Sequence, residues 1–298
     1  MLVILTLLAV AGGVQTARGL FESEELHLVE SFVTINPPLI IASEEKAEAN
    51  PFIPILPEVP KIERPPIDAQ NLAAQFDARN LKITLLASET EIAADKVENC
   101  KSLIESTLTA LPKDLTTSLD EMKLFFAKRS PRGLSNSHLI ELQCSELSDD
   151  EIVSVLVHEL GHIVDLGKLK GDALAPSGFA DGKIKIPADD PSVEFYQLSW
   201  RNEYEKKYLA ERQDFVSGYA MSDAFEDFAE SFNFYILHGE DFRAIKTESP
   251  ILTKKYEFLK NKIFEGVEFT SERKTKDTKR VWDVTLIEFD RDEFFSRG

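Results

Sequence analysis

The sequence has few cysteines, a deficit of positive charge and no long apolar run. Its 298 residues include 2 Cys, and 34 Lys and Arg stand against 52 Asp and Glu, which gives a formal net charge of −18. This charge argues against nucleic acid and anionic membrane surfaces as partners. No apolar stretch has the length of a membrane span, so we expect no stable membrane insertion. We find no internal repeat, no phosphate-binding glycine loop and no convincing setting for a serine or cysteine nucleophile.

Residues 1–70 differ in composition from the rest of the chain. Residues 2–10 are apolar and are followed by small residues, which is typical of a secretory signal peptide over residues 1–19, although the usual basic start is missing. The alternative is an apolar terminus that is buried or disordered. Eight of the 14 prolines lie between Pro37 and Pro66, so residues 20–70 are expected to form an extended arm or a prosegment. Residues 71–298 are then the folded domain of a secreted or periplasmic protein.

The two cysteines, Cys100 and Cys144, are consistent with export. In an oxidising compartment they would form one disulfide between an early helix and the segment before the motif described next. The alternative is a pair of buried thiols. Neither cysteine lies close in sequence to the histidines discussed below, so neither is expected to bind a metal.

The most informative stretch is residues 157–165, which contains the pattern H-E-x-x-H. Residues four apart lie on the same face of a helix, so His158 and His162 can bind one zinc ion together. Glu159, next to the first histidine, is placed to act as general base on a water molecule. The alternative is a pair of core histidines, but it would bury Glu159 without a partner at a high cost in free energy.

The flanking residues predict the helix that this pattern requires. Ser148 and Glu151 have the spacing of a capping box, and the two aspartates between them suit the positive end of a helix dipole. Gly167 should end the helix. Between these limits the apolar residues recur at helical spacing, at Ile152, Val155, Leu156, Leu160, Ile163 and Leu166.

A small sheet is expected before this helix. Alternating apolar residues predict strands at residues 80–87, 122–127 and 137–143, and Pro112 should end a helix over residues 89–111. We expect His138 to Leu142 to be an edge strand beside the motif helix, where an extended peptide could add to the sheet. His138 itself is then an exposed strand residue and not a ligand.

The C-terminal part is expected to be mainly helical, so the predicted fold class is α+β with a small mixed sheet. The aromatic residues Phe195, Tyr196 and Trp200 are expected in the core. Before them, residues 168–191 are predicted to be irregular. The predicted helices and one late strand cover residues 201–216, 223–237, 250–264 and 281–289.

A catalytic zinc needs a third protein ligand. The extended pattern with a third histidine is excluded, because Asp165 replaces its glycine and Lys168 its last histidine. Glu226 and Glu230 share one face of the helix over residues 223–237, and we choose Glu226 as the ligand and Glu230 as the residue that hydrogen-bonds a ligand histidine. The reverse assignment, a local capping role for Glu226, and a solvated helix face are alternatives. Asp165 is expected to support the site or the helix end, not to bind the metal.

These motifs resemble a known family. H-E-x-x-H followed by a helix with E-x-x-x-E resembles the zincin metallopeptidases of the gluzincin type, and the E-x-F-A-E run with a tyrosine seven residues earlier is most similar to the catalytic domain of anthrax lethal factor and the Pro-Pro endopeptidases. The resemblance implies a zincin-like domain with His158, His162 and Glu226 on zinc, Glu159 as catalytic glutamate and Tyr219 as a donor to the transition state. A packed core tyrosine is the alternative for Tyr219.

The resemblance in residues covers only the two motif segments, and the Pro-rich N-terminal part and the long gap between His162 and Glu226 depart from the family. Its substrates and its proline preference are therefore not carried over. The expected function is an exported zinc endopeptidase acting on a peptide or protein substrate. A zinc hydrolase for a non-protein amide and a zinc-containing scaffold protein without turnover are the alternatives.

Overall fold

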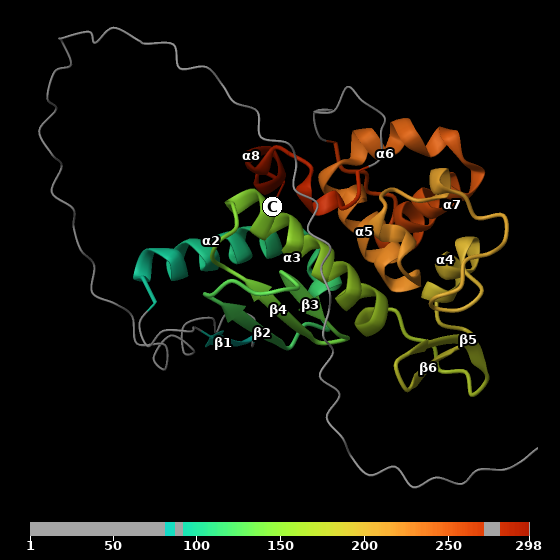
Figure 1. Ribbon diagram of the computed structural model, residues 1–298, viewed down its shortest axis with the longest axis horizontal. Coiled ribbons are helices and arrows are strands. Elements are labelled where there is room, and N and C mark those ends of the chain that lie inside the picture. The colour runs from blue at the N-terminus through green and yellow to red at the C-terminus, as the bar shows by residue number, and fades with distance from the viewer. Residues whose placement is uncertain (1–80, 87–91, 271–280, 298) are drawn as a thin grey trace, which may run out of the picture. The chain divides into compact units, whose positions relative to one another are not determined.

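The computed structural model describes residues 81–86, 92–270 and 281–297, all of which lie within one compact unit, Pro60–Gly298. The predicted signal peptide and Pro-rich arm lie outside the described residues. The α+β class is confirmed, with a small sheet followed by a mainly helical part (Figure 1). The strands are β1 (Lys82–Leu86), β2 (Glu121–Phe125), β3 (Gly133–Ser135), β4 (Leu139–Gln143), β5 (Pro176–Asp181) and β6 (Ile184–Pro187). The α-helices are α2 (Ala94–Ala110), α3 (Asp149–Ile163), α4 (Ser192–Ser199), α5 (Ala224–Leu237), α6 (Gly239–Ile245), α7 (Pro250–Phe258) and α8 (Arg291–Phe295).

The four-stranded sheet is mixed, with the order β1-β2-β4-β3. β2 is parallel to both β1 and β4, whereas β3 runs antiparallel to β4. Alternate residues of the two inner strands are buried, including Met122 and Leu124 on β2 and Ile140 and Leu142 on β4. This period of two places one apolar face against the helices, and α2 and α3 both lie on the same side of the sheet in Figure 1.

The edge strand is not the one that the sequence predicted. The segment from His138 to Leu142 was expected at the edge, but β4 is an inner strand because β3 pairs with it. Asn136 causes the reversal between them: its side-chain oxygen accepts hydrogen bonds from the backbone N–H groups of His138 and Leu139. The edge is therefore β3, which packs beside α3, and His138 lies exposed just before β4.

The motif helix α3 begins where the sequence predicted. The Ser148 hydroxyl accepts a hydrogen bond from the backbone N–H of Glu151 at 3.2 Å. The carboxylate of Glu151 does not complete the capping box; it pairs with Arg132 instead. The helix does not stop at Gly167, because a π-helical turn (Val164–Lys168) continues it.

Helix α3 is buried from Ile152 to Ile163, because the sheet and α2 cover one side and α5 covers the other. At Gly161 the helix lies close against α5. A Cβ atom built at this position would lie 2.9 Å from the Cα atom of Ala229. The absence of a side chain at Gly161 therefore sets how closely the two helices can approach.

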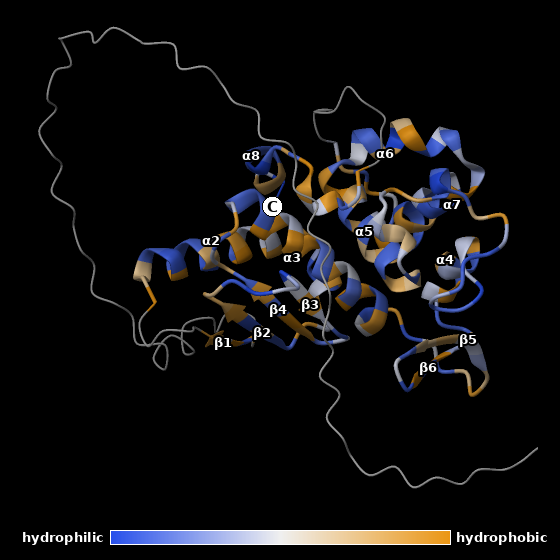
Figure 2. Ribbon diagram, in the orientation of Figure 1, coloured by the Kyte–Doolittle hydropathy of each residue, from blue (hydrophilic) through white to orange (hydrophobic). Residues whose placement is uncertain are grey.

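The C-terminal part is built around aromatic residues, and Phe195, Tyr196 and Trp200 are fully buried in it as predicted. In Figure 2, helix α2 shows alternating hydrophobic and hydrophilic residues, as expected for a helix with one face on the core. Helix α5 carries the predicted apolar face, with Phe228, Ala229, Phe232 and Ile236 all buried. Helix α7 continues as a π-helical turn (Leu259–Ile263), so together they span the helix predicted over residues 250–264.

The helix predicted over residues 201–216 is wrong. This segment is irregular apart from a 3-10 turn (Arg212–Asp214). The side-chain oxygen of Asn202 accepts hydrogen bonds from the backbone N–H groups of Tyr204 and Glu205, which competes with helix formation. Its apolar residues form no continuous buried face: Tyr204, Tyr208 and Leu209 are exposed, and only Phe215 and Val216 at its end reach the core.

Two further elements differ from the sequence prediction. The strand expected over residues 281–289, all of which the structure describes, is absent. That segment contains a 3-10 turn (Val284–Leu286) begun by the side chain of Asp283, and it packs on α3 and α5. The stretch after Gly167, expected to be irregular, contains the β5–β6 hairpin with Gly182 at its turn, where φ is +56°.

Cys100 and Cys144 form a disulfide, as predicted, between α2 and the residue after β4. The closed loop spans 44 residues and includes β2, β3 and β4. The cross-link fixes the chain four residues before the Ser148 cap of α3. Among the described residues, no helix combines the length and the apolar character needed to cross a membrane.

The close contact at Gly161 gives a prediction about stability. Replacing Gly by Ala inside a helix is favourable by about 1 kcal/mol on helix propensity alone. We expect Gly161→Ala to destabilise the protein instead, by about 1–3 kcal/mol, because the new methyl group forces α3 away from α5. Thermal or denaturant unfolding measures the change, and an unfolding midpoint equal to or above that of the wild type would contradict this account of the helix contact.

Candidate metal centre

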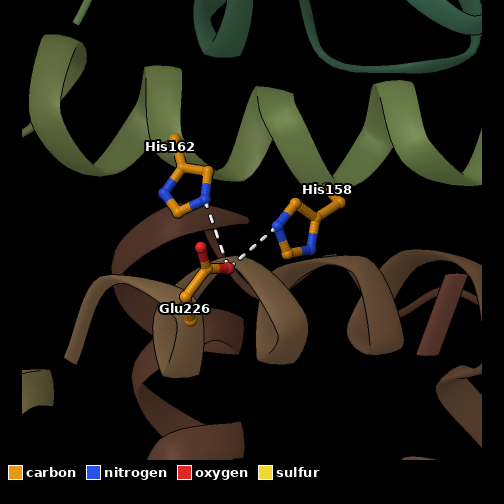
Figure 3. Close-up of side chains that lie close together, drawn as sticks. All are labelled: His158, His162 and Glu226. Atoms are coloured by element: carbon orange, nitrogen blue, oxygen red, sulfur yellow. Dashed lines mark ion pairs between the residues drawn. The ribbon is translucent and has the colours of Figure 1, made fainter. Parts of the chain in front are cut away.

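The three predicted metal ligands come together between α3 and α5. His158 and His162 project from successive turns of α3 toward Glu226 in the first turn of α5 (Figure 3). One carboxylate oxygen of Glu226, Oε2, lies 3.1 Å from Nε2 of His158 and 3.6 Å from Nε2 of His162. The helical spacing of four that the sequence showed places both imidazoles on one face, and the α3–α5 contact brings the carboxylate to them.

The donor atoms fit a divalent cation. The three ligand atoms all lie within 4.8 Å of one another, and a tetrahedral zinc with bonds of about 2.0–2.1 Å would hold its donors about 3.3 Å apart. The Oε2 atom of Glu226 is buried and makes no well-oriented hydrogen bond, although both imidazole nitrogens are close to it. An oxygen and two nitrogens that converge in this way share a cation better than they satisfy each other. The set of two histidines and one glutamate is also typical of catalytic zinc.

The pKa shifts of the clustered residues also indicate that the carboxylates here favour a nearby positive charge. Burial opposes protonation of His158, but the carboxylates of Glu226 and Glu230 outweigh it and hold the pKa of His158 well above its usual value. Burial likewise opposes the charge on Glu226, yet the two imidazoles keep the pKa of its carboxyl far below the usual range. Each group is thus stabilised in its charged form by the others, which is the environment that a metal cation would enter.

Glu159 lies at the same site and faces the edge strand. Its carboxylate accepts a hydrogen bond from the Ser135 hydroxyl at 2.5 Å. A Cβ atom at Gly133 would lie 2.2 Å from Oε1 of Glu159, so β3 passes directly over this side chain. The structure therefore places Glu159 between the candidate ligands and β3, the edge strand of the described sheet.

Glu230 lies one helical turn beyond Glu226 and reaches the other nitrogen of the first ligand. Its Oε1 atom is 3.0 Å from Nδ1 of His158, and the side chain is fully buried. A carboxylate in this position fixes the imidazole with Nε2 turned toward Glu226 and increases its basicity. The structure thus places Glu226 beside Nε2 of His158 and Glu230 beside Nδ1; which of the two would bind a metal stays a prediction.

Tyr219 lies in a 3-10 turn (Tyr219–Met221) that precedes α5. Its hydroxyl donates a hydrogen bond to Oε1 of Glu226 at 3.0 Å, and its ring stacks on His158 with centroids 6.1 Å apart. Burial and the neighbouring carboxylate of Glu226 raise its pKa above the usual value, so the phenol remains a neutral donor. Tyr219 is thus within the site and not in the core behind it.

Asp165 is buried at the end of α3, but its hydrogen bonds go to α4 and not to the ligand histidines. Its Oδ1 atom accepts from the Tyr196 hydroxyl at 2.6 Å, and its backbone carbonyl accepts from the Ser192 hydroxyl. Burial raises the pKa of the Asp165 carboxyl to about 7. These contacts give Asp165 a role in joining the end of α3 to α4, one of the two roles that the sequence suggested for it.

A cavity of about 440 Å³ opens over these groups. Its lining includes the candidate ligands, Glu159 and Tyr219, and it extends along β3. Several lining residues carry no sequence pattern that would have identified them, because they come from the short strand β3 and the residue before it, the β5–β6 hairpin and the segment after residue 280. These are Arg132, Gly133, Ser135, Asp181, Asp283 and Thr285.

The chain matches no model of a known protein family, and no curated protein is significantly similar to it in sequence.

A buried ion pair at Asp227, the residue after Glu226, fixes the orientation of α5. The side chain of Asp227 is fully buried and accepts hydrogen bonds from Nζ of Lys255 at 2.6 Å and from Nε1 of Trp200 at 2.8 Å. Burial raises the pKa of Asp227 and lowers that of Lys255, so each depends on the other to stay charged. Because neighbouring residues on a helix point in different directions, this pair in the core holds Glu226 toward the cavity.

We therefore expect Lys255→Met to destabilise the protein by about 3–5 kcal/mol, because it leaves the buried Asp227 carboxylate unpaired. The exposed pair Arg201–Glu205 is the matched control, and Arg201→Ala should change stability by less than about 1 kcal/mol. Denaturant unfolding of both variants checks the comparison. Equal effects for the two variants would show that the buried pair does not hold α5.

Proposed function

We propose that this protein is a zinc-dependent endopeptidase of the zincin type. The observation that carries the proposal is the convergence of His158, His162 and Glu226 in a cavity that runs beside β3, the edge strand of the described sheet. The fit of the donor set to zinc and the adjacent Glu159 support it. The resemblance of the two motif segments to gluzincins adds to this support.

In this proposal His158, His162 and Glu226 hold the metal, and Glu230 fixes the ring of His158. A bound zinc ion acts as a Lewis acid that polarises a carbonyl group and lowers the pKa of water. Glu159 takes the proton from the attacking water and later gives it to the leaving amine. The Tyr219 hydroxyl turns away from Glu226 and donates a hydrogen bond to the oxyanion that forms on the substrate carbonyl.

The free edge of β3 favours a peptide over other amides. The carbonyl of Arg132 accepts from Gln143 and the N–H of Asn136 donates to Leu139, so these groups face β4. By the alternation of an antiparallel ladder, the backbone groups of Gly133 and Ser135 point the other way, and both residues line the cavity. An extended peptide could pair with them and bring its carbonyl over the metal ligands, within reach of Glu159.

The disulfide between Cys100 and Cys144 is compatible with a protein that acts outside the cytoplasm. Together with the signal-like residues 2–10, it supports export, and we propose a secreted or periplasmic location. The substrate is then an extracytoplasmic peptide or protein. The net charge of −18 disfavours nucleic acid as an additional partner.

Zinc content and cleavage, measured together on three proteins, test the proposed function. We expect about one zinc per wild-type chain by elemental analysis and cleavage of an unstructured protein substrate. Glu159→Gln should keep the zinc and lose cleavage, because the ligands remain and the base is gone. Glu226→Ala should lose both. Full cleavage by Glu159→Gln would refute the mechanism, and a folded wild-type protein without zinc affinity would refute the metal site.

Removal of the Tyr219 hydroxyl separates transition-state stabilisation from metal binding. Tyr219→Phe loses a donor to the developing oxyanion, so we expect kcat to fall by about 10²–10³-fold. The zinc content and KM should change little, because the ring and its stacking on His158 remain. Steady-state kinetics with zinc analysis checks this, and an unchanged kcat would return Tyr219 to a packing role.

A further inference from the structure

The carboxylate behind His158 is itself held in place from outside its own helix. Oε1 of Glu230 contacts His158, whereas Oε2 accepts two hydrogen bonds, from the Ser217 hydroxyl at 2.5 Å and from the backbone N–H of Val284 at 3.0 Å. All three partners of Glu230 are buried. The two donors to Oε2, Ser217 and Val284, lie more than ten residues from Glu230 in sequence. Neither belongs to the motifs that define the candidate metal centre.

Val284 belongs to a segment that we call the C-terminal strap, residues 281–287. The strap also lies along the turn that carries Tyr219: the N–H of Gly218 donates to the carbonyl of Val281 at 2.9 Å, and the N–H of Tyr219 donates to that of Trp282 at 2.5 Å. The strap therefore contacts the segment of Tyr219 and the residue that orients His158 at the same time.

Arg132 fastens the strap to the opposite wall of the cavity. Its Nη2 atom donates to Oδ2 of Asp283 at 2.5 Å and to Oγ1 of Thr285 at 2.9 Å, while Nη1 pairs with Glu151 on α3. Asp283 and Thr285 line the cavity together with Arg132. The strap is thus tied to the sheet edge, to α3 and to the Tyr219 turn, and it closes one end of the candidate site.

The Ser217 hydroxyl, like the strap, contacts both Glu230 and the turn that carries Tyr219. Besides donating to Glu230, its oxygen accepts a hydrogen bond from the backbone N–H of Ala220 at 2.9 Å, which begins the turn that carries Tyr219. One hydroxyl therefore joins the Tyr219 turn to the carboxylate behind His158. Ser217 is fully buried, so solvent does not replace it.

We propose that Ser217 and the C-terminal strap are positioning elements of the metal centre, which hold Glu230 so that it presents His158 to the cation. The proposal rests on the proposed metal site and extends it to residues that touch neither metal nor substrate. Its consequence is that zinc affinity depends on the seating of a segment more than 50 residues after Glu230 in sequence. Loss of comparable outer hydrogen bonds weakens metal binding by about 10–100-fold.

The strap can be tested by removing one N–H group. Val284 is the first residue of a 3-10 turn, a position that tolerates proline. The preceding residue, Asp283, has φ −137° and ψ 122°, which is the conformation that a residue before proline adopts. Val284→Pro therefore removes the donor to Glu230 without opposing the backbone. Val284→Ala keeps the N–H and loses side-chain volume, so it is the matched control.

Ser217→Ala removes the second donor. Its matched control is Ser231→Ala, since Ser231 is another fully buried serine, on α5, whose hydroxyl has no hydrogen-bond partner. For all four variants and the wild type, the zinc dissociation constant is measured by competition with a chromophoric chelator, and the unfolding midpoint is measured on the metal-free proteins. We expect about 10–100-fold weaker zinc binding for Ser217→Ala and Val284→Pro, and near wild-type binding for both controls.

The outcomes distinguish this inference from the proposed function. If the folded wild type binds no zinc, the proposed metal site is overturned and the inference with it. If the wild type binds zinc and Ser217→Ala and Val284→Pro bind it equally well, only the inference is overturned. Weaker binding by Val284→Ala, as large as that of Val284→Pro, would also overturn the role of the strap, because packing would then explain the effect. A change in zinc affinity that does not follow the unfolding midpoint supports positioning.

Discussion

The contact between α3 and α5 is the constraint on which the rest of the site depends. The two histidines lie on one helix and the third ligand on another, so their meeting is set by helix packing and not by local sequence. Gly161, between the two histidines, lies against Ala229, between the two glutamates, and the missing side chain lets the backbones approach. The distances of 3.1 and 3.6 Å between Glu226 and the imidazoles follow from this approach.

Charge is distributed unevenly around the cavity. Five carboxylate residues line it, Glu159, Asp181, Asp223, Glu226 and Asp283, and Arg132 is the one lysine or arginine in the lining that the structure describes. Arg132 is already paired with Glu151 and Asp283. A cavity with this balance attracts cations, because field lines concentrate in a cleft of low dielectric. A divalent metal at the histidines would offset part of the charge.

The sequence predicted the parts of the site that follow from local rules. The helix around His158 and His162 could be expected because its cap and its apolar spacing lie within the same twenty residues, and the same holds for Glu226 and its cap Asp223. The shared face of Glu226 and Glu230 could also be expected, because two residues one turn apart on α5 face the same partner helix.

The rest could not be predicted because it depends on contacts between distant segments. The edge strand was assigned to β4 because β3 has only three residues and no apolar alternation, and its pairing is fixed by a turn at Asn136. The strap was expected to be a strand, since nothing local shows that Val284 would donate to Glu230 or that Asp283 would pair with Arg132. The helix over residues 201–216 was wrongly predicted for a local reason, because the Asn202 side chain takes up backbone N–H groups there and Tyr204, Tyr208 and Leu209 remain exposed.

The two glutamates of α5 are kept in their roles by different physical means. Glu226 lies in the first turn of the helix, where the dipole and the free N–H groups favour an anion, and Asp223 caps the same end. Its carboxylate can therefore face the cavity with one oxygen free of well-oriented hydrogen bonds. Glu230 is a turn further on, beyond the reach of the helix end and fully buried, so its charge needs explicit donors. Ser217 and Val284 supply them, so Glu226 can face the cavity while the carboxylate one turn further on is enclosed.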